Sequence, residues 1–291
     1  MGSLLKKKVI LLSDKSKNKL SLSHIFLHVF LIVSAGIIII PFVWMISTSL
    51  KPLQDVFTLN IEWIPEIFVW ENYIRAWTEL PFLRYLLNSV IVSVVVTLGT
   101  LIFSSMAGYA FGRLNFPFRD QLFLLYLASM MIPVEITVVP NFILMSFLEW
   151  TDTYQGIIAP QMFNIFGTFL MRQFFMSLPK ELEDSAKIDG CSHFKIYYKI
   201  ALPLSKPALA ALGIFAFMGS WNNFLWPLII TKSDNLNTIP VSILSYQGQF
   251  TTDWPVLMAT AGSAVVPVII VYLVFQKYFI EGITFTGMGG R

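Results

Sequence analysis

The chain has 291 residues, of which 56% are hydrophobic and 13% are charged, and its mean hydropathy is +0.69. Soluble domains carry about 25% charged residues, so this composition excludes an ordinary soluble domain and indicates a protein that crosses a membrane several times. The net charge of +3 indicates no nucleic-acid partner, and the single cysteine, Cys191, excludes an intrachain disulfide.

An N-terminal tail, residues 1–24, comes first. Its apolar run is too short for a secretory signal, so we expect a cytoplasmic tail. Six apolar segments follow, each long enough to cross about 30 Å of hydrocarbon. They lie at about 25–49, 85–111, 120–147, 154–175, 207–230 and 255–279. The expected fold class is therefore an all-α polytopic membrane protein with six transmembrane helices.

Prolines and polar residues mark where these helices bend or begin. Pro41 is expected to bend the first span, and Pro133 and Pro140 are expected to interrupt the third. The fourth span is expected to take Thr151 or Asp152 as its N-cap.

The distribution of charge predicts the orientation. Sixteen of the twenty Lys and Arg residues fall in the two tails, in the segments between spans two and three and between spans four and five, or at the adjoining ends of spans four and six. Positive charge favours the cytoplasmic side, so both termini are expected there. All eight tryptophans lie toward the opposite side. They either anchor the chain at the interface or include some that line a cavity opening outward.

A polar, amphipathic segment, residues 177–206, separates spans four and five. Acidic residues near the start of a helix are favoured by its dipole, and three of them follow Pro179. A face of mixed character suits docking into a groove on another protein; it is expected to comprise Leu182, Ser185, Ala186 and Asp189. Gly190 supplies a left-handed stop, and Ser192 is expected to cap a second short helix. The segment is thus predicted to form two helices across the cytoplasmic face.

The same segment contains a spaced motif. Asp184-Ser185-Ala186, three residues, Gly190, nine residues and then Ile200-x-Leu202-Pro203 resembles the E-A-A, G, I-x-L-P coupling motif of the membrane subunits of ABC importers. The resemblance implies that an ATPase subunit docks here, through Glu183, Asp184, Ser185, Ala186, Gly190, Ile200, Leu202 and Pro203. Asp stands where Glu is usual and Ser where Ala is usual. Since Asp is one methylene shorter, either Asp184 or Glu183 could carry the main ATPase contact.

Further runs resemble the permeases of carbohydrate importers. They are Met131–Pro133, Asp152–Gly156, Leu178–Glu183 and Trp221–Ile229, the last of which is similar to WNxFLWPL. The tail that begins at Gln276 resembles the smaller, G-type permease of maltose-type systems. That resemblance implies a C-terminal tail, residues 281–291, that reaches the ATPase through Gly282, Thr284 and Gly287. Residues 25–280 would form the permease domain.

The resemblance implies a multi-pass protein of a bacterial or archaeal cell membrane that imports sugars or oligosaccharides. Its partners would be a second homologous permease, two ATPase subunits and an extracytoplasmic solute-binding protein. No phosphate-binding loop occurs in the sequence, so the chain is expected to hold no cofactor and ATP to bind to the ATPase. No histidine or cysteine cluster has metal spacing. No catalytic constellation is seen, so an enzyme is not expected.

Polar residues inside the spans are candidates for the transport pathway, because they are costly in lipid. Glu135 either faces the pathway or reaches water at the outer interface. Asn222 and Asn223 either line the pathway or bond between helices, and Trp221 beside them is a further candidate for contact with substrate. The loops at 51–84 and 231–254 are expected to meet the binding protein.

Two other readings remain open. An importer of another solute, such as a polyol or a glycerol phosphate, would have the same coupling motif. A self-contained secondary transporter would show inverted repeats and ion sites at the bilayer midplane, and no clear repeat is found in the sequence.

Overall fold

The structure is a computed structural model that describes residues 22–58, 62–247 and 252–287. Apart from one isolated bridge between Gln247 and Thr252, the regular structure in those residues is helical. This confirms the all-α fold class. The expected N-terminal tail lies almost entirely outside the described residues.

Three described helices are long and apolar enough to cross a membrane alone: α2 (Leu22–Ser49), α4 (Phe82–Arg113) and α15 (Trp254–Gly287). Two bent helix pairs raise that number to as many as five if each pair counts as one span. The chain is therefore a membrane protein with several apolar helices. The count of six spans remains a prediction.

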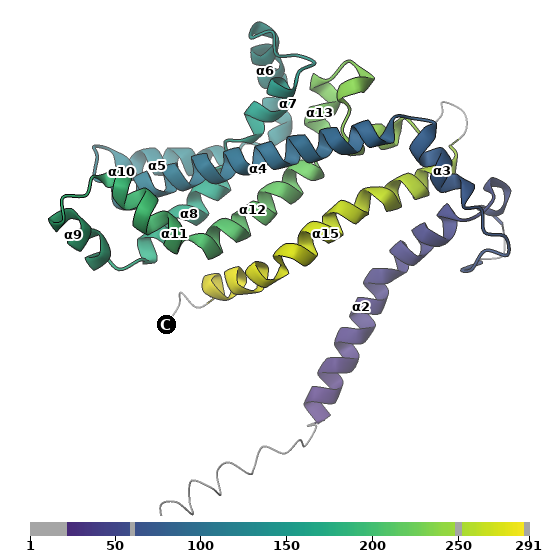
Figure 1. The fold of residues 1–291 in the computed structure, drawn as a ribbon, viewed down its shortest axis with the longest axis horizontal. Helices are drawn as coiled ribbons and strands as arrows, with labels where there is room; N and C mark the ends of the chain where they lie inside the picture. The colour runs from purple at the N-terminus through teal and green to yellow at the C-terminus, as the bar shows by residue number, and fades with distance from the viewer. Residues whose placement is uncertain (1–21, 59–61, 248–251, 288–291) are drawn as a thin grey trace, which may run out of the picture.

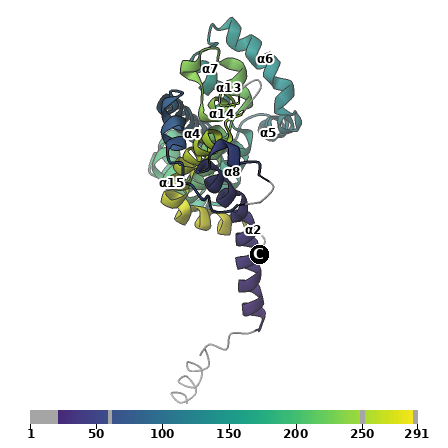
Figure 2. The same cartoon turned by 90° about the vertical axis from the view of Figure 1, so that its right-hand side faces the viewer.

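The third predicted span is broken at Pro133. Helix α5 (Arg119–Ala128) and the 3-10 turn η2 (Ser129–Met131) are followed by α6 (Val134–Phe147), and the two halves meet at a bend of 103°. Proline lacks the amide that would continue the helix, which explains the break. No break occurs at Pro140, which lies inside α6. After this bend α6 leads away from α5 (Figure 2), and Met145 near its C-terminal end packs in one buried cluster with Ile157 and Trp226.

The fourth predicted span is also discontinuous. It consists of α7 (Tyr154–Ile158), the 3-10 turn η3 (Ala159–Gln161) and α8 (Ile165–Ser177). The predicted caps of α7 were wrong: Thr153 is the N-cap, and its hydroxyl accepts from the amide of Gly156. Asp152 instead has a φ of 55°, and its carboxylate accepts hydrogen bonds from the segment that follows α13. The side chain of Asn164 caps α8.

The fifth predicted span divides into α12 (Lys206–Trp221) and α13 (Leu225–Ile230). Before it, the polar segment forms α9 (Glu181–Ile188), α10 (His193–Ile196), a π-helical turn η4 (Tyr197–Ala201) and α11 (Leu202–Leu204). The direction changes by 78° between the helix that ends at Leu204 and α12. The remaining short elements lie in the loops: η1 (Leu53–Asp55), α3 (Glu71–Thr78), η5 (Asp234–Leu236) and α14 (Ile239–Leu244).

Helix α4 is the centre of the packing, with α8 and α12 against it and α15 against α12 (Figure 1). Small residues let membrane helices approach closely. At Gly108 the backbone of α8 is so near that an added Cβ would lie 2.6 Å from the Cβ of Met171. The polar segment lies at the C-terminal end of α4 and α3 at its N-terminal end. The most hydrophobic stretch of α2 is not buried at all.

Candidate coupling elbow and helix breaks

We call residues 177–206, which hold α9, α10, η4 and α11, the coupling elbow. Its turn is built as the sequence predicts. Gly190 has a φ of 74°, the left-handed region that glycine enters without strain. The side chain of Ser192 then accepts from the amide of Lys195. The elbow is therefore two short helical segments separated by a glycine turn.

Helix α9 has one face against the protein and one face open. Glu183 and Ala186 are its buried residues, whereas Ser185 is exposed and Ile188 is 86% exposed. One residue of the predicted docking face is not exposed, because Ala186 packs against the rest of the protein. Its small side chain allows α9 to lie close to the rest of the protein.

The two adjacent acids of α9 have different partners. Oε1 of Glu183 lies 3.1 Å from Nε of Arg113, and the side chains of the two residues are only 10% and 5% exposed. The carboxylate of Asp184 is 65% exposed and lies 3.4 Å from the ammonium of Lys187 on its own helix. Asp184 is thus the carboxylate that another protein can reach, and Glu183 is held inside.

The second half of the elbow is anchored by packing. Ile196, Tyr197 and Ala201 are buried, and the hydroxyls of Tyr197 and Ser105 on α4 lie 2.8 Å apart. The motif residue Leu202 packs against the same cluster as Tyr197 and Ala201. Ile200 is half-buried and Pro203 is exposed. Phe194 and Tyr198 point outward, with 69% and 61% exposure.

The breaks in the fourth and fifth predicted spans are bonded to each other. Nδ2 of Asn223 donates to Oε1 of Gln161 at 2.9 Å, and Nε1 of Trp226 donates to the carbonyl of Gly156 at 3.0 Å. Asn222 is exposed, and its amide donates to the carbonyl of Met218 at the end of its own helix. Free backbone groups at membrane depth occur where they are covered by protein or line a cavity, so these breaks are candidates for the pathway.

Of the other two pathway candidates, Trp221 is buried and Glu135 is exposed. Trp221 is 3% exposed and stacks on Phe217 with ring centroids 5.6 Å apart, so it packs in the core. Glu135 is exposed in the first turn of α6, where the helix dipole favours an acid. Gln161 was missed by the sequence analysis, although an amide inside an apolar segment is the signal that had pointed to Asn222 and Asn223.

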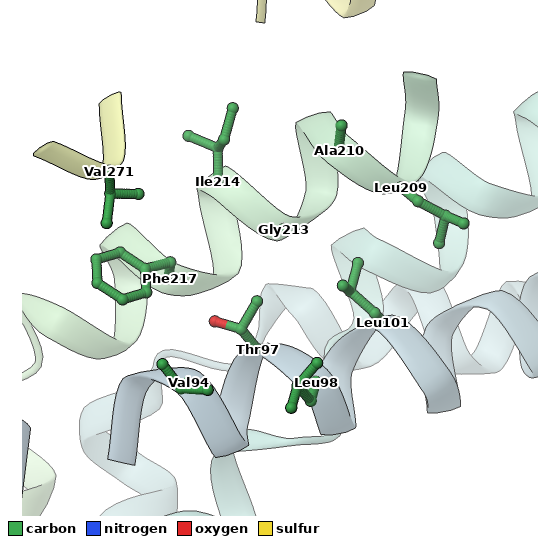
Figure 3. Close-up of a pocket in the computed structure, with 10 residues that line it drawn as sticks. All are labelled: Val94, Thr97, Leu98, Leu101, Leu209, Ala210, Gly213, Ile214, Phe217 and Val271. Atoms are coloured by element: carbon green, nitrogen blue, oxygen red, sulfur yellow. The ribbon is translucent and has the colours of Figure 1, made fainter. Parts of the chain in front are cut away.

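A cavity of about 380 Å³ lies between α4, α12 and α15. Figure 3 shows its lining of aliphatic side chains, Phe217 and a single hydroxyl residue, Thr97. A sugar needs several hydrogen-bond partners, so this cavity does not suit one. In the part of the chain that the structure describes, no group of three or more potential metal ligands occurs.

Residues 281–287 of the expected ATPase-contacting tail lie in the last turns of α15, which continues to Gly287, and the rest of that tail lies outside the described residues. This helix is longer than the predicted sixth span. The burial and contacts of Gly282, Thr284 and Gly287 are not described, so their contact with the ATPase stays a prediction.

Comparison with known proteins matches residues 101–284 to the family described as "Binding-protein-dependent transport system inner membrane component". The arabinooligosaccharides transport system permease protein AraQ of Halalkalibacterium halodurans is 38% identical over 88% of this chain and 93% of that protein. The sn-glycerol-3-phosphate transport system permease protein UgpE of Pectobacterium atrosepticum is 35% identical, over 89% of this chain and 95% of that protein.

Among solved structures, a bacterial ABC transporter involved in the import of alginate superposes with a TM-score of 0.78 at 24% identity, over 89% of this chain and 98% of the matched one. The chain belongs to the family of binding-protein-dependent transport system inner membrane components. It is a membrane-embedded permease subunit of an ABC importer, as the resemblance in the coupling motif implied.

Proposed function

We propose that this permease imports sugars or oligosaccharides, forms half of the translocation pathway and is driven by a separate ATPase that docks on the coupling elbow. The observation that carries the proposal is the open face of α9. It presents the carboxylate of Asp184, 65% exposed, and the apolar side chain of Ile188. A charge beside an exposed apolar group is an expected feature of a docking surface.

The substrate class rests on two observations. Relatives at 35–38% identity are arabinooligosaccharide permeases. The helix breaks also carry neutral amides, Gln161, Asn222 and Asn223, which suit sugar hydroxyls. Import of a glycerol phosphate is the second candidate, since other relatives at 35% identity carry that name. Phosphate recognition favours Arg or Lys, and the segments 128–135, 158–165 and 221–225 contain neither. The sugar is therefore preferred.

The proposed assembly contains a second homologous permease, two ATPase subunits and a solute-binding protein, with ATP bound only by the ATPase. A related fold is solved as an alginate transporter with a periplasmic protein bound. The loops at 51–84 and 231–254 are proposed to face the binding protein. Gly282, Thr284 and Gly287 are proposed to meet the ATPase. Co-purification with an ATPase subunit tests the assembly, and its absence at low salt would contradict the proposal.

The proposed topology has six spans in a bacterial or archaeal cell membrane, with residues 1–24, the elbow and residues 281–291 in the cytoplasm. Cys191, the single cysteine, is half-exposed in the elbow and can report the orientation without a substitution. A membrane-impermeant maleimide should label it in inside-out vesicles and not in intact cells. A Cys191→Ser, Lys232→Cys variant should label in the opposite way. Labelling of Cys191 in intact cells would refute the orientation.

The coupling role is tested at Gly190. Nothing lies within 4 Å of a Cβ added there, so substitution acts through the backbone and through charge. Gly190→Asp places a second acid beside Asp189 on the docking side and should abolish import while the partner still binds ATP. Gly190→Asn is the matched control, because it has nearly the same shape and tolerates the left-handed conformation. It should retain more import. Wild-type import by Gly190→Asp would argue against the elbow as the coupling site.

A further inference from the structure

We propose that Arg113 and Glu183 form a clamp that fastens the ATPase-docking helix to the membrane helices, so that movement of the elbow is passed to α4 and α8. Both are positioning residues, and neither touches substrate or ATPase. The proposal rests on the coupling role proposed for the elbow, and it gives Glu183 a different task from that of Asp184.

The guanidinium of Arg113 touches three elements at once. Arg113 is the last residue of α4, and its Nη2 donates to the carbonyl of Leu178, the C-cap residue of α8. Its Nε lies 3.1 Å from Oε1 of Glu183 in the first turn of α9. Both charges are well placed relative to their own helices, since a cation suits a helix C-terminus and an anion suits an N-terminus.

Burial makes this pair different from the surface pairs of the chain. With 5% and 10% exposure, both side chains are largely shielded from water, and Nε of Arg113 and Oε1 of Glu183 are in contact as an ion pair without the alignment of a hydrogen bond. A buried charge that loses its partner is strongly destabilised. The pair is therefore expected to hold in one arrangement, whereas the exposed pair between Asp184 and Lys187 is free to open when another protein binds.

Little else fixes the first half of the elbow. Glu183 and Ala186 are the buried residues of α9, and Ala186 contributes only a methyl group. The turn that follows holds Gly190 with open space around it. The second half of the elbow, by contrast, is buried through Ile196, Tyr197 and Ala201. The orientation of α9 thus depends mainly on the ion pair.

Helices α4 and α8 are joined so closely that they can respond as one body. An added Cβ at Gly108 would lie 2.8 Å from the backbone nitrogen of Arg172, and Nε of Arg172 donates to the carbonyl of Phe111 at 3.2 Å. A displacement of α9 that reaches Arg113 therefore reaches both helices, and the clamp connects the docking face to the membrane helices.

The direct test measures whether α9 stays fixed to α4. Spin labels on Cys191 and on Met106→Cys, which is 48% exposed on α4, report the distance between the elbow and that helix. In the labelled protein with an intact clamp, the distance distribution should be narrow and equal with and without ATP in the assembled complex. Glu183→Gln should broaden it, and Glu181→Gln, an exposed acid of the same turn, should not. A distribution for Glu183→Gln as narrow as that with an intact clamp would overturn the proposal.

The functional test measures import per ATP hydrolysed in proteoliposomes, with a labelled arabino-oligosaccharide as the probe. Glu183→Gln and Arg113→Gln should each lower this ratio at least tenfold while the complex assembles and hydrolyses ATP within about twofold of wild type. Unchanged coupling would also overturn the clamp. Loss of ATPase association by Glu183→Gln would do so as well, because Glu183 would then act on the ATPase itself.

The double variant Arg113→Gln/Glu183→Gln separates a clamp from two independent contacts. Residues that act as one unit give non-additive losses, so the double variant should be no worse than either single one. Multiplied losses would contradict the proposal. Failure of the wild-type chain to bind an ATPase would instead refute the proposed coupling role, while the distance measurement on the isolated permease would still decide whether the clamp exists.

Discussion

The contact between α4 and α8 at Gly108 gives a prediction whose size follows from the structure. A Cβ at this position would lie 2.6 Å from Cβ of Met171 and 2.8 Å from the backbone nitrogen of Arg172. Carbon atoms normally sit about 3.5–4.0 Å apart, so Gly108→Ala must push the helices roughly 1 Å apart. No rotamer change relieves the contact, because both neighbouring atoms are fixed by the backbone of α8.

We expect overpacking to cost about 1–3 kcal/mol and the better helix propensity of alanine to offset up to about 1 kcal/mol. The net loss of unfolding free energy is therefore about 1–2 kcal/mol. At about 2–4 °C per kcal/mol for large domains, the thermal midpoint of the purified protein in detergent should fall by roughly 2–8 °C. Tryptophan fluorescence during heating measures this midpoint.

Gly219→Ala in α12 is the matched control. Nothing lies within 4 Å of its added Cβ, so only the propensity gain applies and the midpoint should stay the same or rise slightly. Equal midpoints for Gly108→Ala and Gly219→Ala would refute the close approach of α4 and α8, and with it the reasoning that the two helices act as one body.

Two further predictions concern the contact of Asp152 with the segment that follows α13 and the helix breaks. The amide of Lys232, and then that of Ser233, hold the pKa of Asp152 below its ordinary value. Its contribution to stability should therefore be present above about pH 4 and lost as the pH falls below that value. Wild type should show a larger fall in thermal midpoint between pH 5 and about pH 3 than Asp152→Asn, and equal falls would contradict this. Gln161→Leu removes the acceptor of Asn223, and hydrogen bonds of this kind are worth about 0.6–1.7 kcal/mol in membranes. If the whole bond is lost at the rate-limiting step, initial import rates in vesicles should fall roughly threefold to twentyfold for Gln161→Leu but not for Gln155→Leu, and equal rates would show that the bridge has no role.

The sequence predicts local features of the elbow well, because each depends on residues within a few positions of one another. Gly190 takes the left-handed turn and Ser192 caps the next helix, as their residue types require. The break at Pro133 follows from the missing amide in the same way. Pro140 did not break its helix, since a proline interior to α6 can be accommodated where neighbouring groups replace the lost bond.

Long-range pairing was not predictable. Glu183 and Arg113 are 70 positions apart, and nothing in either segment shows that one acid of an adjacent pair turns inward. The helical positions of Glu183 and Asp184 differ by about 100°, so the packing of α9 on α4 and α8 decides which one is buried. The bridge between Gln161 and Asn223 was missed for the same reason, because two breaks must first be brought side by side.

Helix α4 connects the coupling elbow to the loops at its other end. Near the N-terminal end of α4, the amide of Asn88 donates to the carbonyls of Asn235 and Asn237, and its oxygen accepts from the hydroxyl of Tyr154 at 2.6 Å. Arg113 is the last residue at its C-terminal end. The 25 residue steps from Asn88 to Arg113 span roughly 38 Å of helix at 1.5 Å per residue.

No proline interrupts that stretch of α4, so it should transmit displacement without bending. A movement of the elbow that the Arg113–Glu183 pair passes to α4 would therefore reach the loop after α13 and the start of α7 directly. Those two segments adjoin the helix breaks at Gln161 and Asn223. In such an import cycle, α9 would receive the movement of the ATPase and α4 would transmit it. The helix breaks at Gln161 and Asn223 would then change the pathway.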